Sequence, residues 1–128
     1  MKPLTAEWVE VAEGDFIMLQ REMRARKSRV YAGACFLAQQ CVEKYLKACL
    51  CEAGKKFPKT HDLVTLMELA HSIEPSWELL RDAFGRLTDF AVAVRYPGTP
   101  ADASKAKEAN KLCKQFRGMA RRSLGMRD

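Results

Sequence analysis

The chain has 128 residues, of which 48% are hydrophobic and 30% are charged, with only 7 glycines and 5 prolines. This composition is typical of one folded domain, residues 1–128, and it excludes disordered, collagen-like and low-complexity proteins. The 22 basic residues exceed the 16 acidic residues, and the net charge of +6 favours anionic partners.

No stretch of the sequence predicts a membrane span or a signal peptide. The longest run without charged or amide side chains, around Tyr31–Ala38, is far shorter than the ~20 apolar residues that a membrane helix needs. The first residues contain no apolar segment of the kind found in signal peptides. We therefore expect a soluble, cytoplasmic protein without a membrane partner.

The five cysteines form no pattern that suggests disulfides or a metal site. Their number is odd, and their spacing contains no C-x-x-C pair. We predict that Cys35, Cys41 and Cys49 are small buried side chains in a reducing compartment, and we predict neither a metal site nor a cofactor.

Hydrophobic residues recur with the 3.6-residue period of an α-helix along the whole chain, which predicts an all-α protein. The first helix begins with Thr5 as its N-cap and ends at the basic stretch Arg24–Lys27. Ser28 is the expected cap of a second, long helix that ends at Gly54.

The second half of the chain predicts three more helices. A short third helix starts at Thr60 or His61, and a fourth runs from Pro75 to Pro97. A fifth helix follows Pro100. These segments predict an up-and-down four-helix bundle with one additional short helix.

The second predicted helix carries hydrophobic residues on two opposite faces, and such a helix is buried on two sides. One face belongs to the core. The other face, with Phe36, Leu46 and Leu50, has no obvious cover within the chain. The short third helix or a second copy of the chain would cover it. We predict a homodimer, with helix two or helix four at the interface.

Between these two faces, Gln40, Glu43, Lys44 and Lys47 follow the spacing i, i+3, i+4 and i+7 and share one side of the helix. One interpretation is a solvated face with a weak Glu43–Lys47 pair. The other is that the two lysines and the Gln40 amide bind a phosphate group. Asp15 lies near the core edge of the first helix and is expected to be structural, paired with Lys44 or Arg95.

Four segments of the chain, in this order, resemble the HEPN family, the nucleotide-binding domain of prokaryotes and higher eukaryotes. The resemblance runs from about Trp8 to Phe116. The segments are Trp8, Ala12 and Asp15 in the first helix, AQQCVEKYLKA at 38–48, THDL at 60–63 and RYP at 95–97.

The resemblance implies an α-helical bundle that usually dimerises. Stand-alone prokaryotic members are partners of minimal nucleotidyltransferases, often in toxin–antitoxin pairs, and a subset are metal-independent ribonucleases. Those ribonucleases carry an arginine followed, after four to six residues, by a histidine. Arg95 matches the arginine, but positions 100–102 are Pro, Ala and Asp, and no histidine follows His71.

We therefore predict a non-catalytic module that binds nucleotide or RNA phosphate beside a nucleotidyltransferase partner. Arg95 is the expected centre, with Tyr96 stacking on a base. Lys44, Lys47 and Gln40 complete this site, whereas Asp15, Glu43 and His61 are structural polar residues. The alternatives are a ribonuclease toxin with an unconventional acid–base group and a protein-interaction bundle without a ligand.

Two basic clusters are further candidates for phosphate binding or for an acidic partner, and each is equally consistent with a solvated surface. They are Arg21, Arg24, Arg26, Lys27 and Arg29, and, on the fifth predicted helix, Lys107, Lys111, Lys114, Arg117 and Arg121.

Overall fold

The computed structural model describes residues 1–93, 96–98 and 100–127, and in these residues it is all-helical, without a β-strand. The predicted helical bundle with a short extra helix is confirmed. Within these described residues, none of the helices is long and apolar enough to cross a bilayer. The elements are α1 (Pro3–Arg24), α2 (Tyr31–Glu52), α3 (Leu63–Leu69), the 3₁₀ helix η1 (Pro75–Leu80), α4 (Arg81–Ala93) and α5 (Ala103–Ser123).

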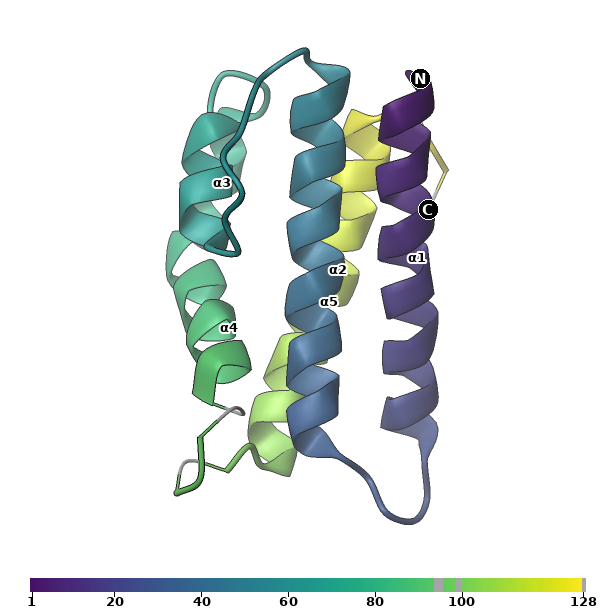
Figure 1. Cartoon of the computed structure of the whole chain (residues 1–128), viewed down its shortest axis with the longest axis vertical. Coiled ribbons are helices and arrows are strands. Elements are labelled where there is room, and N and C mark those ends of the chain that lie inside the picture. The colour runs from purple at the N-terminus through teal and green to yellow at the C-terminus, as the bar shows by residue number, and fades with distance from the viewer. Residues whose placement is uncertain (94–95, 99, 128) are drawn as a thin grey trace.

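Helix α2 is the central element of the bundle. Figure 1 shows it between α1 on one side and the α3–α4 pair on the other, with α5 behind it, and all four pack against it. This position explains why α2 is buried on more than one side. Cys35, Cys41 and Cys49 lie in its buried part as free thiols, as predicted, and burial raises the pKa of Cys49 to about 12.

The central position of α2 also corrects one expectation. Leu46 and Leu50 are fully buried, because α3 and α4 cover the side of α2 that was expected to need a partner. Phe36 alone of that trio is exposed. The apolar face of α2 therefore gives no support to a homodimer beyond Phe36.

Two predicted helix starts are wrong. Helix α1 begins at Pro3 with Lys2 as its N-cap, so Thr5 lies buried inside the first turn. Proline suits a first helical position because the backbone N–H that proline lacks would have no partner within the helix there. Ser28 has a φ of +55°, which places it in the left-handed region, whereas an N-cap residue is extended. It belongs to the turn, and α2 begins at Tyr31.

The third helix also begins later than predicted, because Asp62 rather than Thr60 or His61 caps it. The Asp62 carboxylate accepts a hydrogen bond from the Val64 N–H at 3.0 Å. Thr60 instead accepts from the Asp62 N–H at 3.1 Å and so shapes the preceding turn. The predicted stop of the second helix at Gly54 is confirmed: α2 ends at Glu52, and Gly54, two residues further on, has a φ of +70°.

The fourth predicted helix consists of two elements. Pro75 begins η1, as expected for a first-turn proline, and the chain passes into α4 at Arg81. Its predicted end at Pro97 is not tested, because Val94 and Arg95 lie outside the described residues.

Candidate functional site

The predicted polar strip of α2 divides into an inner and an outer pair of side chains. Glu43 and Lys47 are only 3% and 7% exposed, whereas Gln40 and Lys44 are half-buried. The interpretation of the strip as a uniformly solvated face is therefore wrong.

The inner pair belongs to a buried polar network centred on the Glu43 carboxylate. It accepts hydrogen bonds from Lys47 Nζ and Gln39 Nε2, both at 3.0 Å, and lies 2.9 Å from Nδ1 of His61. Burial alone raises the pKa of Glu43, but these bonds outweigh it and hold the pKa below its ordinary value. Glu43 is therefore a fixed anion within the fold.

Lys47 is held from two further sides by aromatic rings. Its ammonium nitrogen lies 5.6 Å from the ring centre of Trp8 and 5.9 Å from that of Phe57. These rings contact each other edge to face at 6.1 Å between centres. Lys47 thus joins α1, α2 and the loop before α3, and its charge is directed at Glu43 and the rings.

His61 connects this network to the surface. Its backbone oxygen accepts a hydrogen bond from Gln39 at 2.9 Å, while its side chain is 75% exposed. Because Nδ1 is held by Glu43, the opposite ring nitrogen, Nε2, faces away from the carboxylate. His61 therefore anchors the loop and also presents an oriented imidazole to solvent.

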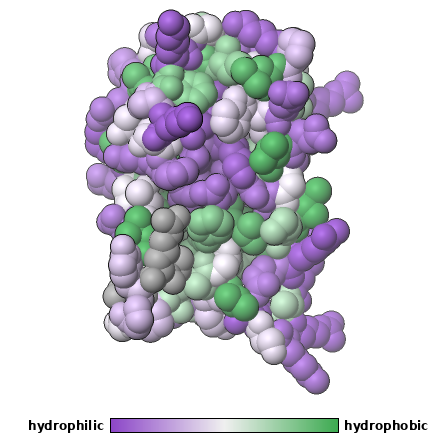
Figure 2. Space-filling model, in the orientation of Figure 1, coloured by the Kyte–Doolittle hydropathy of each residue, from purple (hydrophilic) through white to green (hydrophobic). Residues whose placement is uncertain are grey.

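A groove of about 150 Å³ lies beside His61, between α2 and α4. Figure 2 shows hydrophilic surface over the middle of this side of the molecule and a band of hydrophobic surface below it. The groove has the same mixed character, because amide, imidazole and hydroxyl groups lie beside two aliphatic side chains. Its lining residues are Gln39, Gln40, His61, Thr88, Ala91 and Val92.

The outer lysine of the strip has a carboxylate partner. Lys44 Nζ lies 2.5 Å from Asp15 Oδ2, and the two side chains are 18% and 16% exposed. The structure thus pairs Asp15 with Lys44, one of its two expected partners. Arg95, the other, lies outside the described residues, and Tyr96 is 64% exposed.

The family model of the HEPN domain matches residues 5–123, nearly the whole chain. The chain belongs to the HEPN family. No curated protein and no solved structure matches it.

This HEPN chain contains a second polar network that the sequence pattern did not reveal. Arg117 on α5 forms two hydrogen bonds with Glu13 on α1, at 2.6 and 2.8 Å, and Tyr45 of α2 donates to Glu13 at 2.5 Å. Arg121 donates to the Tyr45 hydroxyl at 3.1 Å. Burial raises the pKa of Glu13, but the hydrogen bonds from Arg117 and Tyr45 outweigh burial and hold this pKa below its ordinary value.

This second network corrects the expectation of one exposed basic cluster along α5. Arg117 and Arg121 have side chains only 21% and 15% exposed, and Glu13 neutralises part of their charge. Lys107, Lys111 and Lys114 are exposed, as expected.

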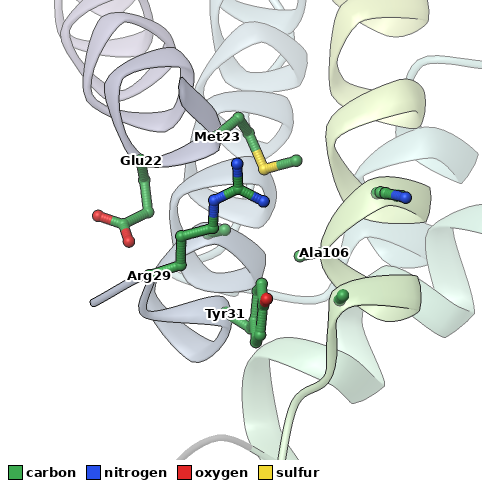
Figure 3. Close-up of a pocket in the computed structure, with 8 residues that line it drawn as sticks. Glu22, Met23, Arg29, Tyr31 and Ala106 are labelled. Carbon is green, nitrogen blue, oxygen red and sulfur yellow. The ribbon is translucent and has the colours of Figure 1, made fainter. Parts of the chain in front are cut away.

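A small cavity beside charged groups lies between α1, α2 and α5. Figure 3 shows Arg29 and Met23 directed into it from one side, with Ala106 of α5 opposite. Its volume of about 20 Å³ is enough for roughly one water molecule, so it holds no nucleotide.

Proposed function

We propose that this HEPN protein binds nucleotide or RNA through phosphate at the groove between α2 and α4. The carrying observation is the groove itself, where Gln40 of the predicted strip meets the exposed imidazole of His61. Its volume of about 150 Å³ suits a phosphate or part of one nucleotide, and a whole drug-sized ligand needs ~300 Å³ or more. The groove therefore holds one phosphate group or one part of a nucleotide, and the rest of the bound nucleotide or RNA lies outside the groove.

The residues around the groove have different parts in this proposal. Gln40 offers an amide and His61 an imidazole, both suited to phosphate oxygens. Lys44 supplies positive charge from the neighbouring turn of α2, whereas Lys47 stabilises the fold through Glu43. Val92 lines the groove three positions before Arg95 in the sequence, which supports Arg95 and Tyr96 as the continuation of the site.

Affinity for a labelled single-stranded RNA of about ten nucleotides tests this proposal. Arg95→Ala should weaken binding by roughly 1–3 kcal/mol, as for a charge-assisted contact. Lys44→Ala should weaken it less, and mainly at low salt. Asp15→Asn should strengthen binding, because it removes the carboxylate that competes for Lys44.

The matched control is Lys114→Ala, which removes an exposed lysine on α5. It should change RNA affinity only slightly and equally at all positions of the RNA. Equal effects of Lys44→Ala and Lys114→Ala would show that RNA binds by overall charge and not at the groove.

The HEPN match also supports a minimal nucleotidyltransferase as the protein partner. If a minimal nucleotidyltransferase is encoded beside this chain, co-expression of the two should yield a complex that survives gel filtration. Separate elution of the two chains would remove this part of the proposal.

One observation favours a second candidate function, ribonuclease activity. The Glu43 carboxylate orients the His61 ring, as carboxylates orient the imidazoles of catalytic histidines, and the groove lies beside His61. In this candidate His61 Nε2 takes the proton of a ribose 2′-hydroxyl, and the 2′-oxygen attacks the adjacent phosphorus. The P–O5′ bond breaks, the O5′ atom takes a proton from solvent, and a 2′,3′-cyclic phosphate forms.

Incubation of the full chain with RNA in the presence of a chelator separates the two candidates. A ribonuclease gives 2′,3′-cyclic ends, and His61→Gln should abolish them while His71→Ala, another exposed histidine, leaves them unchanged. RNA that stays intact, or cleavage that persists in His61→Gln, would remove His61-dependent ribonuclease activity as a candidate.

A further inference from the structure

The amide groups that line the groove between α2 and α4 are oriented by a chain of hydrogen bonds that starts at Glu43. Gln39 Nε2 donates to the Glu43 carboxylate and to the backbone oxygen of His61, at 3.0 and 2.9 Å. Both amide hydrogens of Gln39 are thereby used, and its Oε1 accepts a hydrogen bond from Gln40 Nε2 at 2.8 Å. The Gln40 amide is therefore oriented too. No residue that the structure describes donates to its Oε1, which is left to the groove.

Two further acceptors line the groove for the same kind of reason. Glu43 is an anion, because its hydrogen bonds hold the pKa of its carboxyl below the ordinary value. It therefore accepts the hydrogen on Nδ1 of His61, 2.9 Å away, and Nε2 of the neutral ring is an acceptor. The Thr88 hydroxyl donates to the backbone oxygen of Phe84 at 3.0 Å, so its own oxygen is also left as an acceptor.

The groove is thus lined mainly by acceptors. Among the lining side chains that the structure describes, Gln40, His61 and Thr88 each present one. The remaining donor is the second amide hydrogen of Gln40, and Ala91 and Val92 complete the lining with aliphatic surface. Phosphate oxygens are themselves acceptors. The groove is therefore better matched to a flat group that supplies several N–H hydrogens.

We propose that the groove binds the amino edge of a nucleobase, as found in adenine and cytosine, and that the phosphate lies at its rim. This inference rests on the proposed function, in which one part of a bound nucleotide enters the groove. An amino group supplies two hydrogens, one for Gln40 and one for His61 or Thr88. The ring nitrogen beside the amino group accepts the remaining Gln40 hydrogen, a pairing that glutamine and adenine are known to form. The phosphate is then placed towards Lys44, one helical turn after Gln40.

Uracil and hypoxanthine do not match this arrangement of acceptors. Each carries a carbonyl oxygen where cytosine or adenine carries the amino group. That oxygen would face the acceptors of the groove and leave them without a hydrogen bond, which is costly away from water. The groove therefore distinguishes bases by the presence of an amino group.

Replacement of a single base in one RNA tests the inference. The probe is a labelled oligouridine of about ten nucleotides with one adenosine at its centre. The comparison RNA has inosine at that place, which changes the amino group to an oxygen. The adenosine RNA should bind the full chain roughly fivefold or more tightly, as expected for a direct contact to a base edge. Cytidine at the same place should also bind more tightly than uridine.

The ratio of the inosine and adenosine dissociation constants is the readout for variants. Partial unfolding of a variant changes both constants equally and leaves their ratio unchanged. Gln40→Ala should reduce the ratio to about twofold or less, and Thr88→Val should reduce it in part. The matched control is Gln115→Ala, which removes an exposed glutamine on α5 and should leave the ratio unchanged.

The outcomes separate this inference from the proposed function. If adenosine and inosine RNAs bind equally while Lys44→Ala weakens both, the inference is overturned and phosphate binding stands. A ratio that persists in Gln40→Ala also overturns the inference, because the base is then recognised elsewhere. If none of these RNAs binds the chain, the proposed function is overturned together with the inference.

Discussion

Replacing Glu43 by alanine should destabilise this protein far more than replacing any exposed glutamate. The carboxylate is 3% exposed and satisfies Lys47, Gln39 and His61. Its removal leaves the ammonium of Lys47, itself only 7% exposed, without a counter-ion. The change therefore costs the desolvation of an unpaired buried charge as well as the lost hydrogen bonds.

The magnitude follows from these contacts. Breaking a buried ion pair by removing one partner costs about 3–5 kcal/mol. The three hydrogen bonds do not add to this figure in full, because the rings of Trp8 and Phe57 continue to stabilise the Lys47 ammonium. We predict a loss of ~3 kcal/mol or more in the free energy of unfolding.

Urea unfolding followed by circular dichroism measures this loss. The control is Glu68→Ala, because Glu68 pairs with Arg81 at 2.6 Å but its side chain is 55% exposed. An exposed pair of this kind contributes about 0–1 kcal/mol. Equal losses in Glu43→Ala and Glu68→Ala would refute the reasoning that burial makes the Glu43 network strong.

Three further predictions concern pH, helix α2 and the second network. In the folded state the pKa values of Glu43 and Glu13 lie below their ordinary value of 4.5. The stability that these two carboxylates contribute is therefore present above pH 4.5 and is lost as the pH falls below it. Glu43→Gln should flatten the decline of the melting temperature in that acid range. Leu50→Glu should unfold the chain because Leu50 is fully buried, whereas Phe36→Glu should leave it folded, as circular dichroism will show. Tyr45→Phe should cost about 1–2 kcal/mol in urea unfolding, because it removes a buried donor to Glu13, and an unchanged midpoint would contradict this.

The helices were predictable because their hydrophobic period is regular, and the errors lie at their ends. Ser28 and Thr5 have the residue types of N-caps, but the cap depends on where the backbone is extended, which residue type alone does not determine. Asp62 was an equally good cap beside Thr60, and only its bond to Val64 distinguishes it.

The site was predictable as a set of residues on one helix but not as buried and exposed halves. The spacing of Gln40, Glu43, Lys44 and Lys47 places them on one side of α2, yet the loop that carries Phe57 and His61 decides which of them is covered. Gln39 had a usable signal, its i, i+4 spacing to Glu43.

The second network had no comparable signal in the sequence. Glu13 and Arg117 are separated by 104 residues, and they come together because α1 and α5 both pack on α2. The sequence pattern therefore suggested that Arg117 and Arg121 are exposed to solvent, although their carboxylate partner, Glu13, lies on another helix.

The central claim is that nucleotide or RNA phosphate binds at the groove between α2 and α4. Titration of ¹⁵N-labelled full-length protein with single-stranded RNA, followed by two-dimensional NMR, tests it most directly. The account predicts that the first and largest shifts fall on Gln40, Lys44, His61 and Thr88. Shifts confined to Lys107, Lys111 and Lys114 on α5, or no shifts at all, would contradict it.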